Sequence, residues 1–358
     1  MTKLKEHKPS KIEALKAMTP ADRRRAIFDG IMNNAMFIII ALVIIYVAIK
    51  NPRFLSIPSL VNIVSLTAAK LPIALGVGGC IILAGTDISA GRQVGLAACI
   101  SAGLQLTTNK LFPGLQILPI PVVLLCVLVA CAMVGFVNGF FMAKFKLHPF
   151  IVTLSTQLIV YGLVLLFMQL GTNGGQTLSG MSEGYRNFII KPLLTLKTSS
   201  GPVTVPRYVL YSTIITAIVW VIWNKTAFGK NMYAVGSNEE AANVSGVNVS
   251  KTIILVFVMA GMLYGITGFM DAARIASVNA TTGLNYEADA IAACVIGGIS
   301  FVGGIGKVSG AIIGVLLLQI IFAGLNFLSV DANYLYIVKG LIILIACSID
   351  MRKYLVRK

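Results

Sequence analysis

Long apolar blocks recur along almost the whole chain, and they limit it to a small set of folds. Each block has about 17–25 residues, the length that an α-helix needs to cross the hydrocarbon core of a bilayer. Lipid offers no hydrogen-bond partners, so each crossing segment must satisfy its own backbone groups, which favours helices. The pattern predicts an all-α membrane protein with about ten transmembrane helices. The predicted segments are 31–49, 58–85, 90–107, 120–143, 149–170, 207–223, 252–272, 285–302, 306–327 and 332–349.

Composition and charge agree with this class. Hydrophobic residues make up 57% of the chain and charged residues only 12%, whereas a soluble domain carries about 25% charged residues. A net charge of +16 would suggest nucleic-acid binding in a soluble protein. Here Lys and Arg gather in short loops and tails, where they set the orientation of a membrane protein. We therefore expect lipid, and no nucleic acid, as a partner.

The distribution of basic residues predicts both orientation and domain limits. With the N-terminus inside, ten crossings place both termini in the cytoplasm, on the side richer in Lys and Arg. Residues 1–30 would form a cytoplasmic segment, read either as an interfacial helix starting at Thr19 or as a disordered tail. Residues 31–349 would form the transmembrane domain, and 350–358 a basic cytoplasmic tail. The longest external loop would be 171–206, and the longest cytoplasmic loop 224–251.

Two segments share a pattern. Residues 85–98 and 282–293 each run from a turn with Gly and acidic residues into a helix of small residues. In the predicted topology they enter from opposite faces, which is typical of inverted-repeat halves with broken helices, whose substrate sites lie at the repeat interface. Pro72 is expected to break the long second segment into two pieces.

The sequence contains no pattern for a nucleotide site of its own. A P-loop requires G-x-x-x-x-G-K-[ST], and neither Gly306-Lys307 nor Gly229-Lys230 fits it. Only two histidines are present, and neither belongs to a proton-relay chain or an H-E-x-x-H pattern. A secondary carrier and an intramembrane enzyme are therefore weaker alternatives to a transport subunit driven by another protein. The cysteines lie in apolar runs and form no metal-binding pattern, so we expect buried small hydrophobes at Cys80, Cys99, Cys126, Cys131, Cys294 and Cys347.

Ionisable residues in membrane segments are costly and point to function or to pairing. We expect Asp87 to pair with Arg92, and Asp271 with Arg274. Two further acids, Glu287 and Asp289, would lie at the positive N-terminal end of the eighth segment. Lys70, Lys307 and Lys339 complete this set.

The cytoplasmic loop 224–251 contains a helix signal. Ser237 or Asn238 can cap a helix whose first turn carries Glu239 and Glu240, and Gly246 can end it. A helix of about eight residues is too short to be stable alone, so a partner should brace it. An ordinary connecting loop is the alternative.

Three stretches carry a resemblance to a known family. The run F-G-K-N-x-x-A-x-G-x-N-x-E-A-A-x-x-S-G-V-x-V, starting at Phe228, resembles the coupling loop of ATP-binding-cassette sugar permeases of the ribose/galactose class. Residues 85–96 and 286–298 resemble the same class. Thr86 and the run Ala90-Gly91-Arg92-Gln93 are similar to its galactose/methyl-galactoside branch, although Ile88 and Ala288 replace usual leucines.

The resemblance implies a function and a set of partners. It implies a homodimeric, type II-like importer permease in a bacterial plasma membrane, without a cofactor or catalytic site. An external sugar-binding protein would deliver galactose or a methyl galactoside, or another monosaccharide such as ribose. A cytoplasmic ATPase would grip the coupling loop. The residues implied for that contact are Gly236, Asn238, Glu239, Glu240, Ala241, Ala242, Ser245 and Gly246.

The polar residues within membrane segments are candidates for a sugar path. Each buried sugar hydroxyl needs a hydrogen-bond partner, because leaving one unpaired costs a few kcal/mol. The main candidates are Asp87, Ser89, Arg92, Gln93, Asn138, Thr153, Gln157, Glu287 and Asp289, and the wider set adds Asn62, Ser65, Thr67, Ser155, Asn326 and Asn333. The alternative role for these residues is hydrogen bonding between helices.

Overall fold

The computed structural model describes residues 19, 23, 35–171, 173–198 and 201–355, and it is mostly helical. The predicted interfacial helix within 1–30 and the last residues of the basic tail, 356–358, lie outside the described residues. The helices are α3 (Ala35–Lys50), the 3-10 helix η1 (Pro52–Leu55), α4 (Ile57–Ile82), α5 (Ala90–Gln105), α6 (Ile120–Phe145), α7 (Pro149–Met168), α8 (Glu183–Ile190), α9 (Tyr208–Lys225), α10 (Ala227–Ser237), α11 (Glu239–Val244), α12 (Val249–Ile275), α13 (Tyr286–Ile296), α14 (Val308–Phe327) and α15 (Ala332–Leu355).

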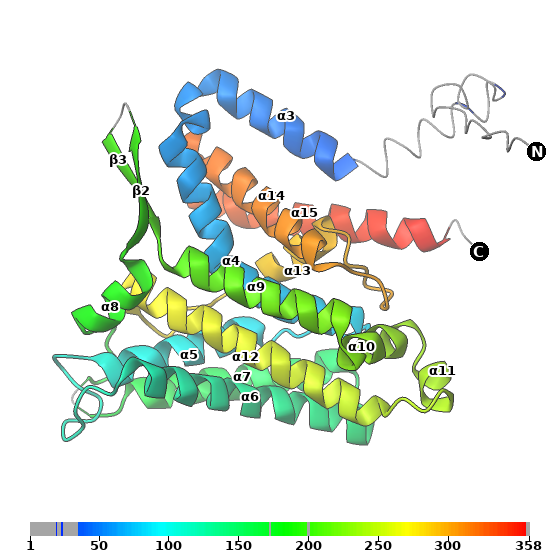
Figure 1. The fold of residues 1–358 in the computed structure, drawn as a ribbon, viewed down its shortest axis with the longest axis horizontal. Helices are drawn as coiled ribbons and strands as arrows, with labels where there is room; N and C mark the ends of the chain where they lie inside the picture. The colour runs from blue at the N-terminus through cyan, green and yellow to red at the C-terminus, as the bar shows by residue number, and fades with distance from the viewer. Residues whose placement is uncertain (1–18, 20–22, 24–34, 172, 199–200, 356–358) are drawn as a thin grey trace, which may run out of the picture.

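Most long helices run between two ends of the molecule (Figure 1). One end carries α8 and the segments 106–119 and 171–206, and we call it the α8 end. The opposite end carries α10 and α11, and we call it the α11 end. The C-terminal end of α15 also lies toward the α11 end.

Local sequence explains where several helices begin. Ser56 caps α4, its side chain accepting a bond from the Ser59 amide at 3.4 Å. Asn248 caps α12 by accepting from the Lys251 amide at 2.9 Å. These polar side chains satisfy amides that have no partner within the helix.

All ten predicted membrane segments coincide with helices. Among the described residues, six helices are long and apolar enough to cross a membrane: α4, α6, α7, α9, α12 and α14. α13 has only 11 residues, about 16 Å at 1.5 Å per residue, which is roughly half of a hydrocarbon core. It is therefore a half-helix rather than a crossing.

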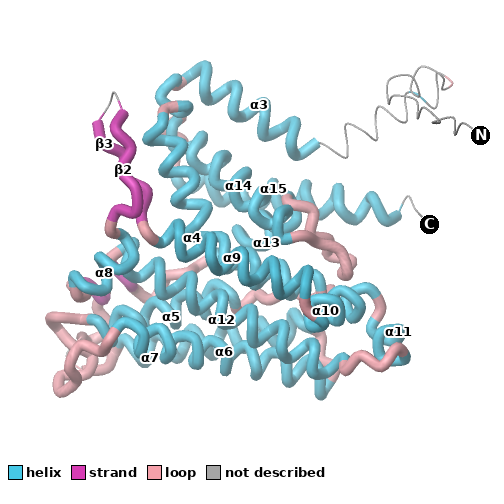
Figure 2. The backbone as a smooth tube through the Cα atoms, viewed as in Figure 1, coloured by secondary structure: helices cyan, strands magenta, loops and turns pink. Residues whose placement is uncertain are grey.

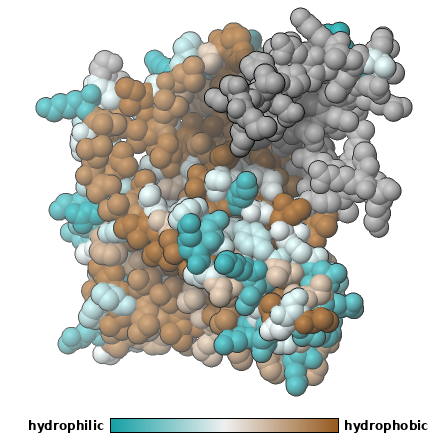
Figure 3. Space-filling view, turned by 45° about the vertical axis from the view of Figure 1, so that its right-hand side comes forward, coloured by the Kyte–Doolittle hydropathy of each residue, from teal (hydrophilic) through white to brown (hydrophobic). Residues whose placement is uncertain are grey.

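α4 and α12 form the centre of the bundle. Two-thirds of the most apolar stretch of each is buried (67%), whereas the figures for α6 and α7 are 22% and 28%. Figure 3 shows apolar residues over most of one face and a hydrophilic patch toward its lower right. Large apolar side chains exposed on α6, α7 and α9 include Leu125, Met133, Phe136, Leu158, Leu166 and Ile218. Such a surface suits lipid, because the hydrocarbon is as apolar as these side chains.

The predicted break at Pro72 is wrong. α4 continues through Pro72 to Ile82, Pro72 is buried, and α4 packs against α12, α13 and α14. Membrane helices tolerate an internal proline when neighbouring helices enclose it. The chain leaves the helix after Ile82 instead, where Ala84 adopts a left-handed φ of 56°.

The structure is mostly helical, in agreement with the predicted all-α class, and it also contains short strands that were not predicted. Strand β1 (Leu178–Ser179) pairs antiparallel with β4 (Ser277–Val278), and Leu178 lies opposite Val278. Strands β2 (Pro192–Thr198) and β3 (Gly201–Pro206) form an antiparallel hairpin in which Leu196 lies opposite Val203. Figure 2 shows these strands confined to the α8 end. Three of them, β1, β2 and β3, lie within the predicted external loop 171–206, where no strand was predicted.

The expectation that the cysteines are buried is correct for four of them. Cys80, Cys99, Cys131 and Cys294 are fully buried. It is wrong for Cys126, which is exposed on α6, and Cys347 is only partly buried. α6 is one of the least buried helices, so an apolar run there faces outward rather than into the core.

Candidate functional site

The predicted short helix in the loop 224–251 is present as α11. Asn238 caps it, accepting a bond from the Ala241 amide at 2.8 Å, and Glu239 and Glu240 occupy its first turn. Gly246 follows with a φ of +84°, a conformation that glycine adopts without strain. The helix has six residues rather than eight. The preceding helix α10, capped by Thr226, was not predicted.

α11 is braced by its own chain. Ala242 packs with Val235 of α10 and Val249 of α12 in a small buried cluster. The outer side is exposed, and Val244 is 89% exposed at the end of the helix. An apolar side chain this exposed on a protruding turn is available for contact with another protein.

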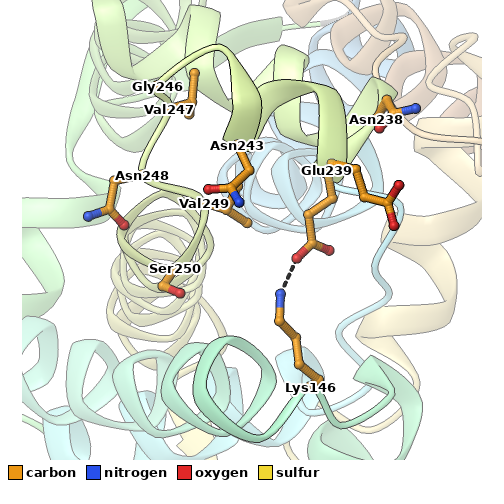
Figure 4. A pocket seen from close by; sticks show the side chains of 10 residues that line it. Lys146, Asn238, Glu239, Asn243, Gly246, Val247, Asn248, Val249 and Ser250 are labelled. Atoms are coloured by element: carbon orange, nitrogen blue, oxygen red, sulfur yellow. Dashed lines mark hydrogen bonds and ion pairs between the residues drawn. The ribbon is translucent and has the colours of Figure 1, made fainter.

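An open hollow separates α11 from the end of α6. Lys146 and Glu239 point toward each other across it and form an ion pair (Figure 4). Both side chains remain 63% and 47% exposed, respectively, so the pair contributes little to stability. The hollow is lined by Lys146, Asn238, Glu239, Glu240, Asn243, Gly246, Val247, Asn248, Val249 and Ser250. Among the eight residues predicted for a partner contact, Gly236 and Ala242 are buried and the other six are exposed.

Four of the predicted path residues meet in one buried network. Ser89 donates from its amide and its hydroxyl to Asp87 Oδ1, at 3.0 and 2.6 Å. The Ser89 hydroxyl oxygen accepts from Gln93 Nε2 at 2.9 Å and from Asn138 Nδ2 at 3.0 Å. All four residues are 0% exposed. The oxygens Gln93 Oε1 and Asn138 Oδ1 form no hydrogen bond, so the network retains capacity to accept hydrogen bonds.

Thr153 lies beside this network, whereas Arg92 and Gln157 form no hydrogen bond with it. The Thr153 hydroxyl donates to the Pro149 carbonyl at 2.9 Å and lies 3.3 Å from the Thr86 carbonyl. Gln157 is half-buried on the same helix, and its side-chain oxygen has no partner. The expected pair of Asp87 with Arg92 is wrong. Arg92 donates to the Ala280 carbonyl at 3.1 Å and lies over the Tyr161 ring.

Asp87 and Arg92 do not pair because the chain between the end of α4 and the start of α5 is not helical. Asp87 belongs to the non-helical stretch before α5 and is oriented by Ser89, whereas Arg92 lies within α5 on the side that faces α7. The two side chains therefore do not share a helical face.

A separate cluster of charges joins four helices. Asp271 pairs with Arg274 at 2.8 Å, as predicted, and also with Lys70 of α4 at 3.7 Å. Lys70 in turn lies over the ring of Tyr286. Asp289 pairs with Lys339 of α15 at 2.8 Å. Lys70 and Lys339 were noted as charges in apolar segments, but no spacing rule could connect them to acids so far away in sequence.

The two similar sequence patterns touch each other. A Cβ added at Gly91 would overlap the Gly283 carbonyl oxygen and the Glu287 carboxylate. A Cβ added at Gly95 would overlap the Thr282 carbonyl oxygen. Gly283 has a φ of +81° and approaches Gly91 equally closely. The start of α5 and the turn that precedes α13 are thus packed backbone to backbone, which only small residues allow.

Comparison with known proteins identifies the family. The profile of the family described as branched-chain amino acid transport system / permease component matches residues 59–347. The galactose/methyl galactoside import permease protein of Haemophilus influenzae is 41% identical over 92% of this chain and 97% of its own length. Its Escherichia coli counterpart is 38% identical over 94% of this chain and 98% of its own length.

Ribose import permeases are also similar to the chain, at lower identity. The ribose import permease protein of Bacillus subtilis is 34% identical over 93% of this chain and 97% of its own length. No solved structure matches the chain significantly. The family match and the apolar helices lead to one conclusion: the chain belongs to the branched-chain amino acid transport system / permease component family and is a multi-pass membrane protein.

Proposed function

We propose that this chain is the membrane-spanning permease subunit of an ATP-driven importer for galactose and methyl galactosides in a bacterial plasma membrane. The observation that carries the proposal is the similarity over nearly the full length to galactose/methyl galactoside permeases, at 41% and 38% identity. Ribose permeases are less similar, at 34% and below for the three organisms compared. The subunit itself hydrolyses nothing, and a separate ATPase supplies the energy.

The α11 end is the surface that we assign to the ATPase. α11 stands out from the bundle, is fixed by its cap and by the Ala242 cluster, and exposes Val244 with two acidic side chains. A partner with a basic rim and an apolar groove would suit this surface, since charge complementarity orients docking and apolar burial stabilises it. The contact residues that we propose are the six exposed members of the predicted set: Asn238, Glu239, Glu240, Ala241, Ser245 and Gly246. The buried Gly236 and Ala242 would hold the helix in place rather than contact the ATPase.

The opposite end would face the sugar-binding protein. It carries the β2–β3 hairpin and α8, which give the loop 171–206 a defined shape suited to docking. With α11 in the cytoplasm, the C-terminal end of α15 is cytoplasmic as well, because it lies toward the same end (Figure 1). We propose that the N-terminus is also cytoplasmic and that two copies of the chain form the working permease.

The sugar path would pass near the junction of α5 with α13. The network of Asp87, Ser89, Gln93 and Asn138 lies at the start of α5, and its unbonded oxygens can accept sugar hydroxyls. In the conformation described these groups are fully buried, so the bundle must open there before a sugar can reach them. Alternating access between the two halves would supply that opening.

The test is the sugar dependence of ATP hydrolysis by the purified complex of permease, ATPase and binding protein. Galactose and methyl galactoside should stimulate hydrolysis, and ribose should not. Equal or stronger stimulation by ribose would overturn the assigned sugar, and the similarity to ribose permeases makes ribose the second candidate.

A second experiment tests the assigned ATPase surface. Reversing charge with Glu239→Lys and Glu240→Lys, or replacing Gly246 with a bulky residue, should reduce the amount of ATPase that co-purifies. Glu183→Lys is the matched control, because Glu183 is also an exposed acid in the first turn of a short capped helix, at the α8 end. Full retention of the ATPase by the α11 variants would refute the assignment.

A further inference from the structure

The C-terminal end of α10 meets the rest of the protein through glycines. A Cβ added at Gly236 would overlap the Ile82 carbonyl oxygen and lie 2.9 Å from the Gly304 amide. One at Gly303 would overlap the Gly236 carbonyl oxygen and lie 2.8 Å from Ala84 Cβ. One at Gly304 would overlap the Ser237 hydroxyl. The three glycines therefore hold three backbone segments in direct contact.

Hydrogen bonds fix the same contact. The Gly304 amide donates to the Ile82 carbonyl at 2.8 Å. The Tyr233 hydroxyl of α10 donates to the Gly306 carbonyl at 3.0 Å. Gly303 and Gly304 have φ values of +88° and +67°, so their turn requires glycine as well as the close approach.

Each of the three segments leads to a different part of the molecule. Ile82 ends α4, and the stretch that follows contains Asp87 and its buried network. Gly303 and Gly304 lie between the half-helix α13 and α14. Gly236 is two residues before Asn238, the cap of α11.

We infer that Gly236, Gly303 and Gly304 form a joint through which a displacement of α11 reaches both the end of α4 and the segment after α13. Contacts between backbones have no side-chain rotamers that could absorb a displacement, so such segments move together. The three glycines are positioning residues, and none of them contacts sugar or nucleotide. The inference rests on the proposed function, because it assumes that an ATPase moves α11.

The test uses Gly236→Ala in the complete complex. The exposed surface of α11 is unchanged, so the ATPase should still co-purify in wild-type amounts and hydrolyse ATP at the basal rate. Sugar uptake per ATP should fall roughly 5-fold or more, the lower range of a typical coupling between sites. Tyr233→Phe removes only the bond to Gly306 and should lower the same ratio about 2- to 10-fold. Gly162→Ala is the control, because a Cβ there meets nothing within 4 Å.

A readout that needs no sugar separates this inference from the proposed function. Val302 is 43% exposed in the segment after α13. Val302→Cys can be labelled with a maleimide after the exposed Cys126 and the partly exposed Cys347 are replaced by Ser. ATP should change its labelling rate in the otherwise unaltered complex and should not change it when Gly236→Ala is added. If ATP changes the rate equally in both, or if Gly236→Ala leaves uptake per ATP unaltered, the joint is refuted. If no sugar stimulates ATP hydrolysis by the unaltered complex, the proposed function is wrong. The ATP-dependent labelling of Val302→Cys still tests whether the three glycines transmit a displacement of α11.

Discussion

Asp271 offers a direct test of the charge cluster, because one carboxylate serves two cations inside the membrane bundle. Its side chain is 0% exposed, with Oδ1 2.8 Å from Arg274 Nε and Oδ2 3.7 Å from Lys70 Nζ. The Lys70 and Arg274 side chains are only 16% and 21% exposed. Asp271→Asn keeps the shape of the side chain but removes the charge. Both cations then remain buried without their counter-ion.

The expected cost is large. Removing one partner of a buried ion pair destabilises a protein by about 3–5 kcal/mol, because the remaining charge is uncompensated. The exposed pair of Lys146 with Glu239 provides the comparison, since its side chains are 63% and 47% exposed. A surface pair of this kind contributes about 0–1 kcal/mol, so Glu239→Gln should change stability little.

The assay is thermal unfolding of the purified chain in detergent. At about 2 °C per kcal/mol for a chain of this size, Asp271→Asn should lower the midpoint by about 6 °C or more. Glu239→Gln should shift it by less than about 2 °C. Adding Lys70→Met to Asp271→Asn should recover part of the loss, because it removes one uncompensated charge. A midpoint for Asp271→Asn within 2 °C of the unaltered chain, on the same scale, would refute the reasoning.

Three further predictions concern the proposed sugar path and the helix α11. Ser89→Ala leaves the side-chain amide donors of Gln93 and Asn138 without their acceptor, which costs about 1–3 kcal/mol. Sugar uptake by the reconstituted complex should therefore fall while the complex still assembles, and normal uptake would contradict this. Gly91→Ala forces α5 away from the segment before α13 and should abolish sugar uptake, whereas Gly162→Ala, at an unobstructed position, should not. Equal uptake by the two variants would show that the contact of α5 with this segment is dispensable. Asn238→Ala removes the cap of α11 at a cost of about 1 kcal/mol and should speed amide exchange in that helix; unchanged exchange would show that the cap is unimportant.

The apolar blocks of the sequence predicted much of the fold, because a segment that crosses lipid must be long, apolar and helical. Each of the ten apolar segments is a helix, including the segment 285–302, which contains only the short α13. The short helix α11 could also be predicted, since a capping Asn followed by two Glu and ending at Gly is a local signal. Among the residues that the structure describes, six helices satisfy the length and composition of a crossing.

Features that depend on tertiary packing could not be predicted. Pro72 was expected to end a helix, but neighbouring helices enclose it and α4 continues. Strand β2 shows no alternation of burial along its length, so its pattern is not distinct from that of a loop. The pair of Lys339 with Asp289 joins residues 50 positions apart. The network of Asp87, Ser89, Gln93 and Asn138 could be predicted in part. Its members were candidates because they are polar residues in membrane segments, but their contact with Asn138 depends on the packing of α6 against α5.

The central claim is that this chain moves sugar only when a separate ATPase drives it, and transport in liposomes measures that most directly. The purified chain alone, with ATP inside the vesicles and galactose outside, should accumulate no sugar above the external concentration. Adding the ATPase and the binding protein should produce accumulation that stops when ATP is exhausted. Accumulation against a gradient by the chain alone would contradict the account.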